Sequence, residues 1–332
     1  HHLADGWAAA RALDLPASFA AIDRIVSVGQ GAAAISGGLF AALLAPESPL
    51  PITVVRDDEL PAFVHGANTL VIASSTSGDT VGDAAETLAA FDQAHARGCQ
   101  LLALTGGGAL AERARLDQAA LMLLNDMSPA RDAIGWSLAA LLQIASRLQW
   151  SHDFTADLVE AIEITQAWSR DLAAASPVAQ NLAKREAGQL VDRFVVVHGA
   201  GHFVEVARHW QQRLNVSAKA WAAVEAIPDA NHHTLSGVDF PADFSHQVMA
   251  LFLTGASDRP RHAQRLVLTQ RAFMLSGCNT DILRARGRSP LAQVMSLVTL
   301  GECLSTYLAL LYGVDPAHVD ALISFQNDLA DE

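Results

Sequence analysis

The chain has 332 residues, 51% of them apolar, with a formal net charge of −13 and a pI of about 5.4. This length accommodates two α/β domains of ordinary size, and an acidic chain is a poor candidate for nucleic-acid binding, which needs clustered Lys and Arg. No uninterrupted apolar run approaches the roughly 20 residues of a membrane span, and three distant cysteines without a C-x-x-C motif disfavour both disulfides and zinc, so we expect a cytoplasmic protein with no membrane partner, metal or cofactor.

The first half of the sequence alternates short apolar segments with longer helical patterns. Strands are expected over 24–28, 52–55, 69–73, 101–104 and 120–124, and helices over 33–44, from about 80 to 97, and over 109–116. Alternation of this kind is typical of a parallel sheet with helices on both faces.

Two further helices, over 133–148 and 156–173, follow this first half, and then the pattern restarts. IVSVGQG at 25–31 is matched by VVVHGAG at 195–201, each a strand that runs into a G-x-G turn and a helix. The later strands are expected over 193–197, 222–226, 248–253 and 272–275, with a helix over 203–214. The sequence therefore predicts an α/β domain over 1–150, a helical linker over 151–180, and a second α/β domain with a C-terminal helix over 181–332.

The segment VIASSTSGDT at 71–80 is the strongest local signal for binding. It places the hydroxyls of Ser75, Ser77 and Thr80 between an apolar strand and a helix, where unpaired N–H groups and the helix dipole favour an anion. Gly78 allows the main chain to approach a ligand closely. On composition alone, a polar loop that only caps the helix is an equally good interpretation.

At these residues the sequence resembles the sugar isomerase (SIS) domains, which carry a strand, an S-x-S-G-x-T loop and a helix. The match is Ser75, Ser77, Gly78 and Thr80, and the resemblance implies that this loop holds the phosphate of a sugar phosphate. RDDELPAFV at 56–64 and RGCQLLALTGGG at 97–108 extend the likeness. SPARDAIGW at 128–136 puts Arg131 where the family has an arginine near the substrate, although an arginine that caps a helix is the plainer interpretation of the residue by itself.

The second half resembles the bifunctional phosphoglucose/phosphomannose isomerases through NLAKREAGQL, VVVHGAGHFVEVARHWQQRLN and IPDANHH, in that order. The resemblance implies two three-layer SIS domains, each a mostly parallel sheet flanked by helices, and aldose–ketose interconversion of hexose 6-phosphates without a cofactor. It also implies a homodimer in which His232 reaches the site of the neighbouring subunit and assists ring opening.

Three positions depart from the family's pattern. The glutamate that serves as the base falls on Val216, a lysine of the last helix falls on Gln326, and a substrate-binding serine falls on Ala33. General-base catalysis contributes roughly 10²–10⁴ in rate, so this loss matters. His233 is a candidate replacement base, since imidazole titrates near neutral pH. The alternative is a catalytically impaired protein that binds sugar phosphates in a regulatory role.

Overall fold

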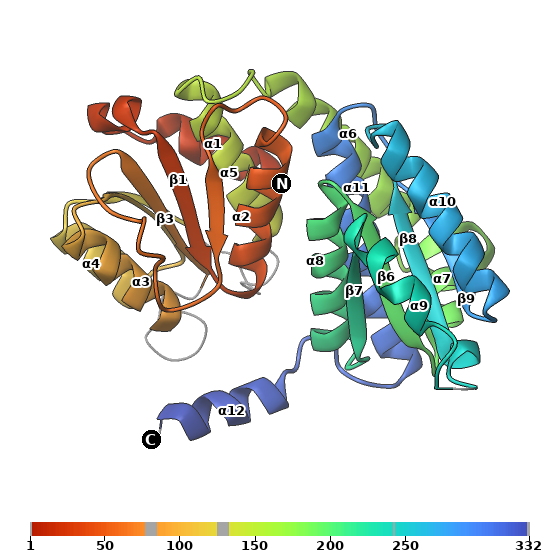
Figure 1. Ribbon diagram of the computed structural model, residues 1–332. Coiled ribbons are helices and arrows are strands. Elements are labelled where there is room, and N and C mark those ends of the chain that lie inside the picture. Colours follow the sequence, from red (N-terminus) through yellow and green to blue (C-terminus); the bar gives the residue numbers. More distant parts are fainter. Residues whose placement is uncertain (1, 77–84, 125–132, 242, 331–332) are drawn as a thin grey trace. The chain divides into compact units, whose positions relative to one another are not determined.

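The computed structural model describes residues 2–76, 85–124, 133–241 and 243–330 (Figure 1). The chain forms two compact units, His1–Leu158 with Ala321–Glu332, and Val159–Asp320. Each unit is built on its own parallel sheet. The predicted α/β class, with two sheets flanked by helices, is confirmed.

The first unit contains a five-stranded parallel sheet in the order β2-β1-β3-β4-β5. Its strands are β1 (Arg24–Gly29), β2 (Ile52–Val55), β3 (Thr69–Ser75), β4 (Gln100–Thr105) and β5 (Ala120–Leu123). Its helices are α1 (His2–Ala12), α2 (Gly31–Leu44), α3 (Ala85–Ala96), α4 (Gly108–Leu116) and α5 (Ile134–Arg147), with the short 3-10 helix η1 (Ala17–Ala21). Figure 1 shows α3 and α4 on one face of the sheet and α1, α2 and α5 on the other.

The second unit contains a four-stranded parallel sheet in the order β7-β6-β8-β9. Its strands are β6 (Phe194–Ala200), β7 (Ala222–Ile227), β8 (Val248–Thr254) and β9 (Asn279–Arg284). The helices are α7 (Leu182–Leu190), α8 (Phe203–Val216), α9 (Thr234–Gly237), α10 (Pro260–Leu275) and α11 (Pro290–Leu311), with 3-10 turns at η3 (Val178–Gln180), η4 (Asp229–His232) and η5 (Ser245–Gln247). Helix α6 (Thr155–Asp171) runs from one unit into the other, and α12 (Asp320–Ala330) ends the chain.

The strand expected at 272–275 is wrong, because these residues form the last turn of α10. Phe273 is buried in the core beneath that helix, whereas Met274 and Leu275 are exposed, so the apolar run that indicated a strand is one helical turn with a single buried side chain. The fourth strand is β9, whose sequence NTDILR contains no apolar run. It was missed because it is an edge strand that is only partly buried.

Helix α11 is long and apolar enough to cross a membrane by length and composition, with a mean hydropathy of 1.6 over 18 residues. Polar residues such as Gln293 and Glu302 lie within it, so its sequence contains no uninterrupted apolar run of membrane-spanning length. In the structure 61% of that window is buried, and α11 packs against α7 and α8. This is the environment of a core helix in a globular domain.

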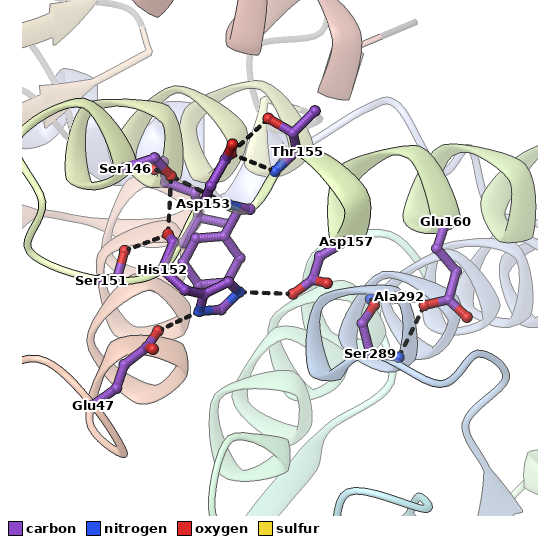
Figure 2. A network of polar contacts seen from close by, with 12 residues as sticks. Glu47, Ser146, Ser151, His152, Asp153, Thr155, Asp157, Glu160, Ser289 and Ala292 are labelled. Atoms are coloured by element: carbon purple, nitrogen blue, oxygen red, sulfur yellow. Dashed lines mark hydrogen bonds and ion pairs between the residues drawn. The ribbon is translucent and has the colours of Figure 1, made fainter.

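A polar network fixes the start of α6 to the first unit (Figure 2). The His152 ring lies between two carboxylates, with Nδ1 2.7 Å from Glu47 Oε1 and Nε2 3.2 Å from Asp157 Oδ2. Burial lowers the pKa of His152, but the two carboxylates outweigh it and the net pKa is raised. Asp153 caps the helix by accepting from the backbone N–H and the hydroxyl of Thr155.

Candidate functional site

The first sheet has its topological switch point between β1 and β3, since the chain continues from β1 to one side and from β3 to the other. The loops that follow such strands diverge, and open α/β sheets bind ligands in the crevice between these loops, at the carboxyl ends of the strands. Gly29 at the end of β1 lies beside Ser74, and Ser75 at the end of β3 lies beside Thr105 of β4.

Two glycines allow the main chain to pack tightly at this edge. A Cβ on Gly29 would lie 2.8 Å from the carbonyl oxygen of Ser74, and a Cβ on Gly106 would lie 2.3 Å from that of Thr76. Both distances are below van der Waals contact with backbone atoms that cannot move aside. A larger residue at either position would therefore push apart the strand ends that border the crevice.

The predicted phosphate loop is described at its two ends. Ser75 is the last residue of β3 and its side chain is buried, and α3 begins at Ala85, so a strand leads into the loop and a helix follows it, as predicted. Ser77, Gly78, Thr80 and Arg131 lie outside the described residues. Their contact with a phosphate therefore remains a prediction.

In the second unit, side chains of the protein bridge the loops at the corresponding switch point. The switch point there lies between β6 and β8, and the loops after these strands meet at a hydrogen bond of 3.0 Å between His202 Nε2 and Ser257 Oγ. Ser257 Oγ donates to Gln293 Oε1 at 2.7 Å, and Gln293 Oε1 also accepts from the Ser257 backbone N–H at 3.0 Å. Since the Ser257 hydroxyl proton is already donated to Gln293, His202 acts as the donor to this serine and is not positioned to activate it.

Asp258 completes this internal network. Its Oδ2 accepts hydrogen bonds from the Gly255 backbone N–H at 3.0 Å and from the hydroxyl of Thr254. A carboxylate of the protein thus takes the N–H and hydroxyl donors that a bound anion needs in a strand-to-helix loop. The loop after β8 is therefore a structural counterpart of the phosphate loop, occupied by the protein itself.

The two predicted catalytic histidines lie together at the surface of the second unit. His232 ends η4, and His233 follows with Nδ1 2.8 Å from Thr234 Oγ1 and Nε2 3.6 Å from Asp229 Oδ2. Both side chains are exposed. The side chain of the preceding Asn231 holds this turn against α10 through hydrogen bonds with Thr269 and Arg265.

The positions that depart from the family pattern lie in three separate elements. Ala33 is buried in the first turns of α2, Val216 is the last residue of α8, and Gln326 lies in α12. The backbone carbonyl of Val216 accepts a hydrogen bond of 2.7 Å from Lys219 Nζ, which also contacts the carbonyls of Asp315 and His318. The side chain at 216 offers no proton acceptor, as the sequence indicated.

Two other histidines of the second unit are buried in its interior. His198 stacks on Phe252, with ring centroids 4.4 Å apart, and burial lowers its pKa to about 4. Burial also lowers the pKa of His209 in α8 to about 3. Both rings are neutral near pH 7, and they pack as part of the core. In the part of the chain that the structure describes, no three His, Cys, Asp or Glu side chains group closely enough to hold a metal ion.

Sequence reasoning missed one pair of acidic residues. Glu186 of α7 and Asp281 of β9 lie 95 positions apart in the sequence and face each other in the second unit. No local motif surrounds either residue. A signal for this pair exists only in the tertiary structure.

Comparison with known proteins gives consistent results. Residues 179–329 match the family described as "Bacterial phospho-glucose isomerase C-terminal SIS domain". The bifunctional phosphoglucose/phosphomannose isomerase of Caldicellulosiruptor bescii is 32% identical over 313 residues, which cover 93% of this chain and 90% of that protein. The protein of the same name from Thermoplasma volcanium is 26% identical over 308 residues, or 93% and 92% of the two chains.

Solved structures confirm the fold at lower sequence identity. The C-terminal domain of the glucosamine-fructose-6-phosphate aminotransferase of Francisella tularensis superimposes with a TM-score of 0.74 at 13% identity, covering 95% of each chain. The tagatose-6-phosphate ketose/aldose isomerase of Escherichia coli gives a TM-score of 0.66 at 17% identity, covering 89% of this chain and 83% of that one.

Proposed function

This chain belongs to the family of the bifunctional phosphoglucose/phosphomannose isomerases, and on that premise we propose that it acts on hexose 6-phosphates. The proposed reaction interconverts fructose 6-phosphate with glucose 6-phosphate or mannose 6-phosphate. The observation that carries the proposal is the similarity over 93% of the chain to a curated isomerase of this name. The fold supports it, because the crevice at the ends of β1 and β3 adjoins the loop that begins at Ser75.

The proposed chemistry moves one proton between C1 and C2 of the open-chain sugar, with no net oxidation. A base takes the proton from C2 of the aldose and electrons move onto the carbonyl oxygen O1; the proton of the C2 hydroxyl passes to O1, and the resulting enediolate is protonated at C1 to give the ketose. We assign ring opening to His232 and stabilisation of the enediolate charge to Arg131. His233 is the proposed base; its Nδ1 lies 2.8 Å from Thr234 Oγ1, and its Nε2 lies 3.6 Å from the Asp229 carboxylate, which would stabilise the imidazolium.

A second candidate is binding of a sugar phosphate without turnover. The observation that favours it is Val216, because the residue at the end of α8 cannot take a proton. In this case the phosphate crevice of the first unit retains its ligand and the protein acts as a sensor or regulator. The two candidates make the same prediction for binding and opposite predictions for isomerisation.

One pair of measurements separates the candidates. Calorimetric titration with fructose 6-phosphate tests binding, and incubation with glucose 6-phosphate in D₂O tests chemistry, because an enediolate acquires deuterium from solvent even when turnover is slow. Deuterium incorporation at C2 supports the isomerase. Binding without incorporation supports the regulator, and in that case Val216→Glu with Gln326→Lys is expected to restore exchange. Absence of binding to any hexose 6-phosphate would sink both.

The assignment of the base has its own test. His233→Ala is expected to abolish deuterium exchange while fructose 6-phosphate still binds, and Asp229→Asn is expected to lower the exchange rate less severely. His246→Ala is a matched control, since that histidine is also exposed and lies in the same unit. An exchange rate unchanged by His233→Ala would remove this residue from the mechanism.

We further propose a cytoplasmic homodimer in which His232 acts on the sugar phosphate of the neighbouring subunit. Its exposure at the surface supports this assignment. Subunit exchange tests it: Ser75→Ala and His232→Ala are each expected to be inactive, whereas a mixed dimer contains one intact site and recovers activity. If the mixture stays inactive after exchange, or the protein is monomeric in sedimentation, the arrangement in trans is wrong.

A further inference from the structure

A pocket lies in the second unit at the amino ends of the strands, and thus at the opposite end of the sheet from the switch point. Its volume is about 280 Å³. Helix α7 forms one wall, and the first residues of β8 and β9 form the other, so residues from three elements converge. Small-molecule sites of proteins start at about this size.

The wall of this pocket contains a buried carboxyl group. Glu186 is 5% exposed, and its Oε2 has no hydrogen-bond partner among the described residues. The side chain faces Asp281, and a hydrogen bond between the two carboxyl groups requires a shared proton. Burial and the negative charge of Asp281 raise the pKa of Glu186 to about 7. A buried polar atom without a partner is uncommon in proteins and needs an explanation.

Two arginine side chains also line this pocket. Arg185 precedes Glu186 in α7, and its charge partly offsets the effect of Asp281 on Glu186. Arg193 is held in place by hydrogen bonds from its Nη1 to the carbonyl of Gln189 at 2.8 Å and to the side-chain oxygen at 3.4 Å. Among the described residues neither arginine forms an ion pair with Glu186 or Asp281, so the pocket presents both signs of charge side by side.

We propose that this pocket is a second ligand site for a small molecule that carries both an ammonium group and a phosphate or carboxylate group. The ammonium group lies between Glu186 and Asp281, in the place of the shared proton, and satisfies the unpartnered oxygen. The anionic group pairs with Arg185 and Arg193, which bind phosphate or carboxylate in a two-pronged manner. Amino sugar phosphates and amino acids share this chemistry.

Binding in this manner has a measurable signature, because an ammonium group that enters the pair displaces a proton. Near pH 7 about half of the molecules carry that proton, so binding releases roughly half a proton there and becomes tighter as the pH rises through about 7. The other charged groups that face the pair are Arg185 and Arg193, and guanidinium groups do not titrate in this range. For the carboxylate probe, a site that recognises only the anionic group releases no proton near pH 7, because a carboxylate is already ionised there.

The test is a calorimetric titration of the full chain held in excess fructose 6-phosphate, which occupies any sugar-phosphate site of the first unit. Glucosamine 6-phosphate probes the ammonium–phosphate arm and γ-aminobutyrate the ammonium–carboxylate arm, and N-acetylglucosamine 6-phosphate serves as the matched compound without a cation. We expect saturable binding of at least one probe, no binding of the acetylated compound, and proton release measured in buffers of different ionisation enthalpy.

Variants locate the binding. Glu186→Gln keeps the shape and the hydrogen bond to Asp281 and removes the charge, so it is expected to weaken binding by more than about tenfold. Glu112→Gln on the exposed face of α4 is the control and leaves binding unchanged. Absence of saturable binding below about 10 mM of either probe, or equal affinity in Glu186→Gln, overturns the proposal. Because fructose 6-phosphate is present throughout, failure here leaves the proposed isomerase function untouched.

Discussion

Replacing Glu186 with glutamine is expected to stabilise the folded protein at alkaline pH and to have a smaller effect at acidic pH. On folding, the pKa of this carboxyl group rises from 4.5 to about 7, chiefly through burial and next through the charge of Asp281. A raised pKa means that the folded state holds the proton more strongly than the unfolded chain. The favourable contribution is therefore complete below pH 4.5 and is lost as the pH rises towards about 7. Glutamine does not titrate, and its amide donates to Asp281 at every pH.

The magnitude follows from the size of the shift. The full difference in pKa corresponds to about 3–4 kcal/mol, and because Asp281 is only partly buried, solvent screening reduces this to about 1–2 kcal/mol. Between about pH 5.5 and about pH 8.5 the glutamine variant is expected to gain roughly 1 kcal/mol relative to the native chain. For a unit of this size, that change raises the melting temperature by about 2–4 °C.

Differential scanning calorimetry of the full chain at the two pH values measures this effect. Glu112→Gln is the control, because it makes the same chemical change on an exposed helix surface of the first unit. The reasoning is refuted if Glu186→Gln shifts the melting temperature equally at both pH values, or if the variant is less stable than the native chain at alkaline pH.

Substitutions at three further residues test the positioning of other elements. Lys219→Met removes the ammonium that binds the carbonyls of residues 216, 315 and 318, so hydrogen exchange over 313–319 is expected to accelerate, and an unchanged pattern would contradict this role. Asp258→Ala is expected to destabilise the second unit by about 1–3 kcal/mol in urea denaturation, and Asp258→Asn, which keeps an acceptor oxygen, by less than half as much; equal effects would argue against the hydrogen bonds as the cause. The raised pKa of His152 means that its favourable contribution to folding is lost as the pH rises above 6.5, so His152→Gln is expected to make the stability of the protein depend less on pH in this range. The difference is expected to be less than about 1 kcal/mol, because the ring is half exposed. A stability that falls more steeply with pH in the variant would refute this interpretation.

The fold was predictable where sequence period and burial agree. Strands such as 101–104 and 248–253 are apolar throughout because these inner strands of parallel sheets are covered on both faces, and short runs of this kind recur between helices. The prediction failed where a strand has a polar sequence. β9 is an edge strand with a polar sequence, so it was not predicted. Phe273 and the two residues after it form an apolar run that is typical of a strand, but they belong to α10. Local pattern cannot distinguish one turn of helix from a short strand when the run has three or four residues.

The candidate site was predictable only as far as its signal is local. The hydroxyl spacing from Ser75 to Thr80 is written in consecutive residues, and so is the replacement of the expected base by Val216. The hydrogen bonds that bridge the loops of the second unit could not be predicted from consecutive residues, because they depend on Gln293 of α11 reaching the loop that contains Ser257. Contacts between residues this far apart in the chain follow from the packing of whole elements.

Two polar clusters of the second unit differ in a way that bears on function. Around Asp258 and Gln293 each buried acceptor has a donor of the protein, so the network is complete and a ligand could enter only by breaking it. At Glu186 a buried oxygen has no such donor, and a second carboxyl group stands opposite. A complete hydrogen-bond network is accounted for by its contribution to folding. An acidic pair that lowers stability near neutral pH is not, and this favours a role in function. The stability measurement and the ligand titration on Glu186→Gln therefore belong together: a variant that is more stable and no longer binds an ammonium ligand identifies the pair as a binding site.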